Sequence, residues 1–142
     1  MQPTLYSVYD DVVRLRLIGW RNVSAMSFDD LEKAYNGTGP EFLPAPIRAK
    51  LDAACRPFLP AVMVHDVDFT RSDGTVGSFR AANRRLLFNC ITCALNEYPW
   101  YSWRRYALVL EAFVIYRVCS KFGWIAWRSA YHSNVAASAT PN

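Results

Sequence analysis

One stretch decides the fold of this chain: residues 60–69, with the sequence PAVMVHDVDF. Pro60 suits a first helical turn, where its missing N–H would have no intrahelical partner. The run that follows is apolar except at His65, Asp66 and Asp68, which predicts a buried helix interrupted by three polar side chains. Because burying polar groups is costly without compensation, these three residues are the first candidates for a functional site.

A glycine-containing segment lies upstream of this helix, at residues 36–40, NGTGP. It cannot continue a helix, because glycine permits positive φ values and proline biases its neighbour away from the α region. It follows a short predicted helix that begins after Ser27, whose spacing to Asp30 is that of a capping box, and ends at Tyr35. Residues 36–40 are therefore predicted to form a loop with exposed backbone.

The rest of the chain is predicted to be mainly α-helical. Apolar stripes, caps and prolines mark further helices from Pro46 to before Pro57, from Ser78 to about Tyr98, and from about Ser102 to Lys121.

The N-terminal part, residues 5–20, alternates only loosely and contains the β-branched pair Val12-Val13, which leaves short strands or a short helix open. With 142 residues, just over half of them apolar, the chain is long enough for one core and too short for two. We expect a single domain over residues 1–132 and a flexible, small and polar C-terminal tail over residues 133–142.

The formal charge of +4, from 16 basic and 12 acidic residues, suits docking on an anionic surface. It falls short of a nucleic-acid-binding composition, so no nucleic-acid partner is expected. The first residues contain no basic region followed by an apolar run, so no secretory signal is expected. Charged side chains at Glu111, Arg117 and Lys121 interrupt the last apolar helix, at roughly 2.5–3.5 kcal/mol each, which disfavours a membrane span.

Aromatic residues are dense between residues 98 and 127. Such a region fits either core packing or a helix lying at a lipid interface, and base rates favour the core. The arginine pairs 84–85 and 104–105 are expected on solvated helix faces. The four cysteines lack zinc-ligand spacing and are expected to be reduced and packed as small hydrophobic residues.

The pair His65-Asp66 carries the chemistry of the predicted site. Consecutive helical residues point about 100° apart, so both side chains can line one cavity wall, one as a base and the other as a metal ligand. Ca²⁺ takes carboxylate and backbone carbonyl oxygens, and a glycine loop such as residues 36–39 can turn successive carbonyls inward. Asp66 together with that loop is a plausible calcium site.

Two motifs in this order resemble the phospholipase A2 superfamily. Residues 65–69, HDVDF, resemble its His-Asp-x-x-Tyr signature, and residues 35–39, YNGTG, resemble its calcium loop in the compact Tyr-x-Gly-x-Gly form of parvoviral capsid phospholipases. Short prophage-encoded proteins with an Asn-Gly-x-Gly-Pro segment followed by His-Asp are also similar. The resemblance covers residues 35–90.

The resemblance implies a phospholipase A2-like helical core with a calcium loop, beginning at Tyr35, and hydrolysis of carboxylic esters in phospholipid. His65 would be the general base that deprotonates the attacking water. The Asp66 carboxylate would bind Ca²⁺, with the ligand shell completed by the backbone carbonyls of residues 37–39, which are Gly37, Thr38 and Gly39. The implied partner is a phospholipid or membrane surface.

The chain departs from the family at two supporting positions. Asn83, in residues 82–86, ANRRL, stands where the family has the aspartate that hydrogen-bonds the catalytic histidine, so it offers no negative charge to an imidazolium. Phe69 stands where the family has tyrosine, and Asp68 is an alternative carboxylate for the network. A second hypothesis is therefore a non-catalytic structural or interaction protein, such as a phage particle component or the partner of an effector assembly, that keeps the fold.

Overall fold

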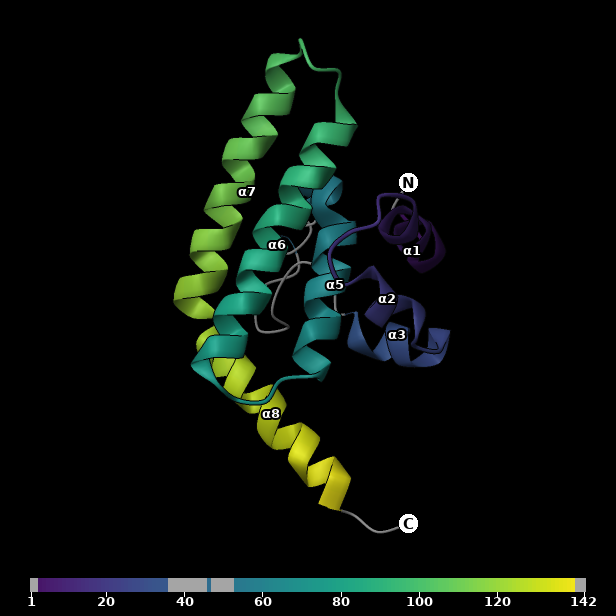
Figure 1. Cartoon of the computed structure of the whole chain (residues 1–142). Helices are drawn as coiled ribbons and strands as arrows, with labels where there is room; N and C mark the ends of the chain where they lie inside the picture. Colours follow the sequence, from purple (N-terminus) through teal and green to yellow (C-terminus); the bar gives the residue numbers. More distant parts are fainter. Residues whose placement is uncertain (1–2, 36–45, 47–52, 140–142) are drawn as a thin grey trace.

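The computed structural model describes residues 3–35, 46 and 53–139. This described part is mainly helical, as predicted, and contains no strand (Figure 1). No described helix is both long enough and apolar enough to cross a membrane. The predicted helix from Pro46 to before Pro57 falls largely on residues 47–52, which lie outside the described residues.

The N-terminal segment forms α1 (Leu5–Arg14), so the alternative of short N-terminal strands is wrong. The side chain of Thr4 caps this helix by accepting a hydrogen bond from the backbone N–H of Ser7. Val8 and Val12 are both buried, and their spacing of four residues puts them on one helical face. The β-branched residues are therefore part of a helix, because tertiary packing outweighs their small preference for strands.

Two short helices follow, α2 (Trp20–Ser24) and α3 (Phe28–Ala34), the second capped by Ser27 as predicted. Gly19 precedes α2 with a φ of 99°, and a Cβ there would lie 2.9 Å from Cγ1 of Val64, so the position requires glycine. The buried side chain of Asn89 fixes the same segment: its amide oxygen accepts from the N–H of Ile18 and its amide nitrogen donates to the carbonyl of Ile18.

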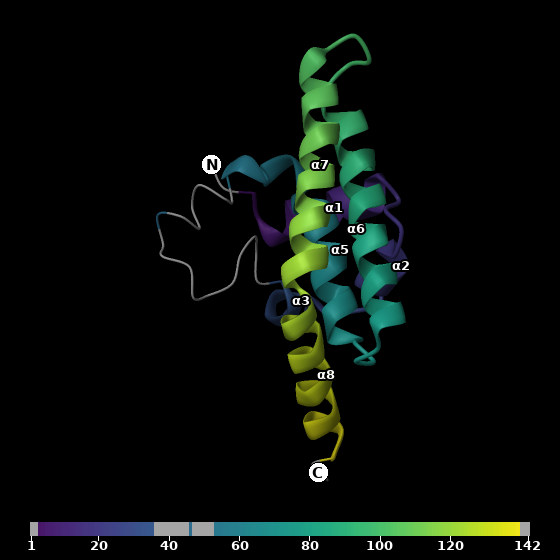
Figure 2. The same ribbon diagram turned by 90° about the vertical axis from the view of Figure 1, so that its left-hand side faces the viewer.

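The predicted functional helix is α5 (Leu59–Thr70), which follows the 3₁₀ turn η1 (Arg56–Phe58). It lies at the centre of the structure and contacts α1, α2, α3, α6 and α8 (Figures 1 and 2). Its buried residues Met63, Val64 and Val67 belong to the main hydrophobic core. The polar side chains of α5 are therefore held on a helix surrounded by others.

The long helix α6 (Val76–Glu97) runs back along α5. Its N-cap is Thr75, whose side chain accepts from the N–H of Ser78, so the helix begins before the predicted cap at Ser78. After a short turn, α7 (Trp103–Phe122) packs against α6 as a hairpin, close to the range predicted from Ser102 to Lys121.

The last helix, α8 (Trp124–Ala139), extends beyond the rest of the structure in Figure 1. Residues 133–139, which the sequence placed in a flexible tail, are thus helical, and residues 140–142 lie outside the described part. The buried indole of Trp127 anchors α8 at the end of α5, where Ser72 Oγ donates to the carbonyl of Trp127 and Asn134 Nδ2 to that of Thr70. Small polar residues can continue a helix when one large side chain docks it.

Candidate functional site

His65 on α5 and Asn83 on α6 form the centre of the candidate site. The His65 Nε2 and Asn83 Oδ1 atoms are 3.0 Å apart, although the residues are eighteen positions apart in the chain. Because an amide oxygen only accepts hydrogen bonds, Nε2 must carry the proton, and the lone pair is then on Nδ1. The two positions matched by the sequence motif therefore meet, and the ring has the tautomer that a base acting through Nδ1 requires.

Asn83 is an unusual residue for its surroundings. It is 1% exposed, and its amide nitrogen Nδ2 is buried with no hydrogen-bond partner among the described residues. A buried donor without a partner costs about 1–3 kcal/mol. A carboxylate at this position would present two acceptors and leave no donor unpaired.

An aromatic wall stands beside the histidine. The ring of Phe69 lies 5.0 Å from the ring of His65 and 5.0 Å from that of Trp127, measured between centroids. Phe69 therefore supplies apolar contact, and no hydroxyl, beside the imidazole. Trp127 was not singled out by the sequence, because only the docking of α8 brings it to the site.

Asp68, one turn after His65, is engaged in an ion pair. Its side chain is almost fully buried, and its Oδ2 accepts from Nε of Arg85 at 3.0 Å. Arg85 therefore does not lie on a purely solvated face, in contrast to the expectation from sequence. The pair places one negative and one positive charge near the imidazole, and these two charges shift the pKa of His65 in opposite directions.

Burial sets the charge state of His65. Desolvation lowers the pKa of His65 below its ordinary value, while the hydrogen bond to Asn83 and the charge of Asp68 act in the raising direction and Arg85 in the lowering one. Because desolvation is the largest cause, the imidazole is neutral at pH 7. A neutral imidazole is the form that accepts a proton from water.

This lowered pKa predicts a pH-dependent stability. Below a pH of about 6.5, His65 takes up a proton in the unfolded chain before it does so in the folded protein. The free energy of unfolding should therefore fall as pH drops from about 6.5 toward the lower folded-state pKa of His65, and then cease to change on its account. In urea unfolding at several pH values, the free energy of unfolding of His65→Gln should fall less steeply with decreasing pH than that of the wild type. The variant His132→Gln, at an exposed position on α8, is the control; if it flattens the profile equally, the assignment to His65 is wrong.

The calcium site predicted from sequence falls only partly on described residues. Asp66 is half-buried on α5, directly after His65, whereas Gly37, Thr38 and Gly39 lie outside the described residues. Tyr35, which precedes them, ends α3 and packs partly buried against the core that contains α5.

Asp66 is the one described member of the predicted calcium-ligand set. It has a carboxylate, and hard oxygen ligands are what Ca²⁺ prefers. Within residues 3–35, 46 and 53–139, no three His, Cys, Asp or Glu side chains cluster as metal ligands. The remaining ligands would have to be backbone carbonyls, as the sequence predicts.

The four cysteines form no disulfide with one another, as expected from their spacing. Cys90 and Cys93 are buried in the core. Desolvation raises the pKa of Cys93 to about 12 and that of Cys119 to about 11, and it raises the pKa of Cys90 as well. These thiols are protonated at neutral pH, which makes them poor nucleophiles.

Two hollows of the described surface flank these elements. A groove of about 610 Å³ is lined by Asn83, by the aromatic side chains of Phe79 and Trp124, and by the exposed Arg80 and Arg84. Of the His65–Asn83 pair, Asn83 is the residue that lines this groove.

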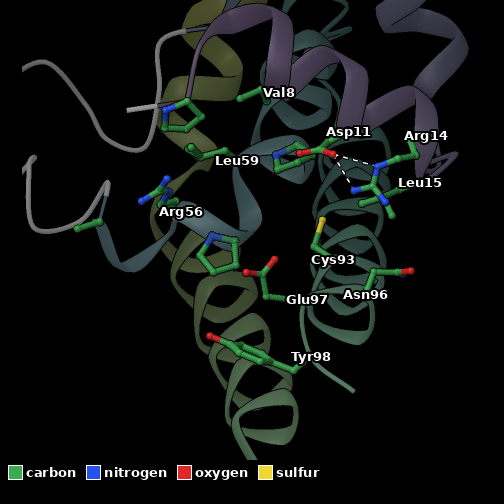
Figure 3. A pocket seen from close by; sticks show the side chains of 14 residues that line it. Val8, Asp11, Arg14, Leu15, Arg56, Leu59, Cys93, Asn96, Glu97 and Tyr98 are labelled. Carbon is green, nitrogen blue, oxygen red and sulfur yellow. Dashed lines mark hydrogen bonds and ion pairs between the residues drawn. The ribbon is translucent and has the colours of Figure 1, made fainter. Parts of the chain in front are cut away.

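The other hollow, of about 470 Å³, lies at the opposite end of α6 (Figure 3). Asp11 and Arg14 point toward each other in it, with a 2.7 Å salt bridge, and Arg56, Glu97 and Tyr98 are also part of its wall. It contains none of the site residues predicted from the sequence.

The site thus consists of a neutral histidine on α5, an asparagine that holds it from α6, and an aromatic wall that includes a residue of α8. Its nearest buried carboxylate, Asp68, is already paired with Arg85. Comparisons of the chain with protein-family models, with curated proteins and with solved structures find no match.

Proposed function

We propose that this protein is a calcium-dependent, phospholipase A2-like lipid hydrolase in which His65 activates the attacking water. The observation that carries the proposal is the hydrogen bond from His65 Nε2 to Asn83 Oδ1 between two adjacent helices. It leaves Nδ1 as the basic atom of a neutral ring, and it joins the two positions at which the motif expects a catalytic histidine and its partner.

The chain's own residues would perform the proton transfers. Nδ1 of His65 takes a proton from water as the water attacks the ester carbonyl, and the resulting imidazolium returns the proton to the leaving alcohol. Asn83 keeps the ring oriented through Nε2, and Phe69 limits the access of bulk water to one side of it. No covalent intermediate is needed.

Asp66, with the carbonyls of residues 37–39, would hold the calcium ion. Bound Ca²⁺ would polarise the ester carbonyl and neutralise the phosphate of the lipid. The position of Asp66 immediately after His65 on α5 supports this role, because a base and a metal ligand must both reach one ester group.

The proposal predicts hydrolysis that depends on calcium. Purified protein mixed with phospholipid vesicles should release free fatty acid in millimolar Ca²⁺, lose this activity when EGTA is added, and regain it when excess Ca²⁺ is restored. Mg²⁺ at equal concentration is the control for charge alone, because it demands a tighter octahedral shell. Fatty-acid release that continues unchanged in EGTA would exclude the calcium-dependent mechanism.

One observation favours a second candidate, a non-catalytic structural or interaction protein such as a phage particle or effector component. Asn83 lacks the carboxylate that the resemblance would require to stabilise an imidazolium, and Phe69 lacks the hydroxyl that would help hold that carboxylate. The buried Nδ2 of Asn83 also has no partner among the described residues. This candidate predicts no fatty-acid release even at high protein concentration, together with a melting temperature that Ca²⁺ does not change.

A further inference from the structure

Large apolar side chains are exposed along one face of α7. Trp103, Leu110 and Val114 are 73%, 69% and 61% exposed, and at 100° per residue they lie within about 40° of one another around the helix. Ala112 is the buried residue of α7 and points the other way. Figure 2 looks onto α7, and no described element lies in front of it. The aromatic region predicted to pack in the core is therefore largely at the surface.

The exposed surface continues into the turn before α7. Trp100 and Tyr101 in that turn are both more than 70% exposed. Contiguous apolar patches of this kind mark interaction sites, whereas single exposed apolar residues do not. We define the α7 face by its exposed apolar residues: Trp100, Tyr101, Trp103, Tyr106, Leu110, Phe113, Val114, Val118 and Phe122.

The charges on this face are mainly positive. Arg117 and Lys121 lie within about 40° of the direction of Trp103 around the helix, and neither forms a salt bridge with a described residue. Glu111, the acidic residue of α7, lies about 80° from that direction and the exposed Arg104 about 100°, both within the angular range of the exposed apolar residues. The face therefore carries three cations and one carboxylate. The surface that covers the α7 face should therefore be apolar and should carry negative charge.

A second copy of this chain does not meet that requirement. In a two-fold pairing the same patch meets itself, so the three cations of each copy would be brought together with only one carboxylate per copy to pair with them. Removing such charges from water without partners is strongly unfavourable. The exposed aromatic residues at the end of the hairpin are Trp and Tyr, the types enriched where a bilayer meets water.

We propose that the α7 face docks on the surface of an anionic lipid bilayer, with α7 lying in the plane of the interface. The apolar side chains would enter the boundary between headgroups and acyl chains, and Arg117 and Lys121 would pair with lipid phosphates. This inference goes beyond the proposed hydrolysis, because docking by this face does not depend on the chemistry of His65.

The test measures sedimentation of the full-length protein with vesicles in EGTA, where the proposed hydrolysis is absent. Binding to phosphatidylglycerol vesicles should exceed binding to phosphatidylcholine vesicles and should weaken in 0.5 M salt. The double variant Leu110→Ser with Val114→Ser should bind roughly tenfold or more weakly. The matched control is Tyr6→Ser with Ile18→Ser, two exposed apolar residues that lie outside α7, which should bind like the wild type.

A second pair of variants tests the charges. Arg117→Gln with Lys121→Gln should weaken binding to phosphatidylglycerol vesicles by roughly 10- to 30-fold, and Arg21→Gln with Arg71→Gln, two exposed arginines outside the face, should weaken it less.

Two results would overturn the proposal. One is a failure of the wild type to bind either kind of vesicle; if analytical ultracentrifugation then shows a dimer that Leu110→Ser with Val114→Ser dissociates, the face is a self-association surface. The other is equal loss of binding in the variants of the face and in their controls. If vesicles are bound through the α7 face but no fatty acid is released in Ca²⁺, the proposed hydrolysis fails and the docking stands.

Discussion

Replacing His65 with glutamine is expected to lower the rate of calcium-dependent lipid hydrolysis by roughly 10²–10⁴-fold, the usual contribution of a general base. The glutamine amide nitrogen can still donate to Oδ1 of Asn83, so the link between α5 and α6 can persist. What is removed is the basic Nδ1 atom, because an amide does not accept a proton near neutral pH. Initial rates of fatty-acid release, measured at saturating lipid and Ca²⁺, are the readout.

The matched control for this variant is His132→Gln. His132 is exposed on α8, and its replacement should leave the rate within about twofold of wild type, since surface changes rarely perturb the fold. Circular dichroism and urea unfolding should show that both variants are folded. A folded His65→Gln protein with the wild-type rate would remove His65 from the mechanism.

The second large effect is expected for Asn83→Asp, which should raise the turnover number by roughly 10- to 1,000-fold. An aspartate 3.0 Å from Nε2 would stabilise the imidazolium that forms in the transition state, and in serine proteases the converse loss of charge costs about 10⁴-fold. The change also removes the buried donor that has no partner among the described residues. A negative charge this close should raise the pKa of His65, because it favours the protonated imidazolium.

Two measurements check this prediction: the turnover number at saturating lipid, and the titration of the His65 ring by NMR. The titration should move to higher pH, and the fall in stability on acidification that is due to His65 should become smaller, because the folded-state pKa of His65 moves toward its value in the unfolded chain. Asn89→Asp is the control, because Asn89 is an equally buried asparagine of α6 whose side chain hydrogen-bonds the backbone of Ile18 and not His65. That variant should lose stability and gain no activity. A raised pKa without faster turnover would show that His65 and Asn83 interact but do not catalyse.

Local features of the sequence predicted much of the helical framework. Ser27 caps α3 as expected, and the apolar run after Pro60 forms α5, because caps and helix-compatible prolines act within a few residues. The resemblance to the phospholipase A2 superfamily matched Asn83 to the residue that holds the histidine, and these two positions lie within hydrogen-bond distance. The loop of residues 36–40 lies outside the described residues and stays a prediction.

Other features depended on which elements meet, and there the sequence was silent or misleading. The valines of α1 are compatible with a strand or a helix in isolation, and burial against the core selects the helix. The polar segment after Ser133 is helical because it continues a helix that Trp127 docks on the core. No pattern within the segment itself predicts that helix.

What the sequence by itself determined about this protein is its helical class, the starts of α3, α5 and α7, and the residue types available for acid–base and metal chemistry. Only the tertiary structure decided that Asp68 is paired with Arg85 and that Trp127 completes the wall beside Phe69. It also decided that the aromatic residues of α7 face outward. The physical reason is that helical periodicity defines which side chains share a face, whereas burial and charge pairing depend on what that face meets, and distant parts of the chain supply the partner.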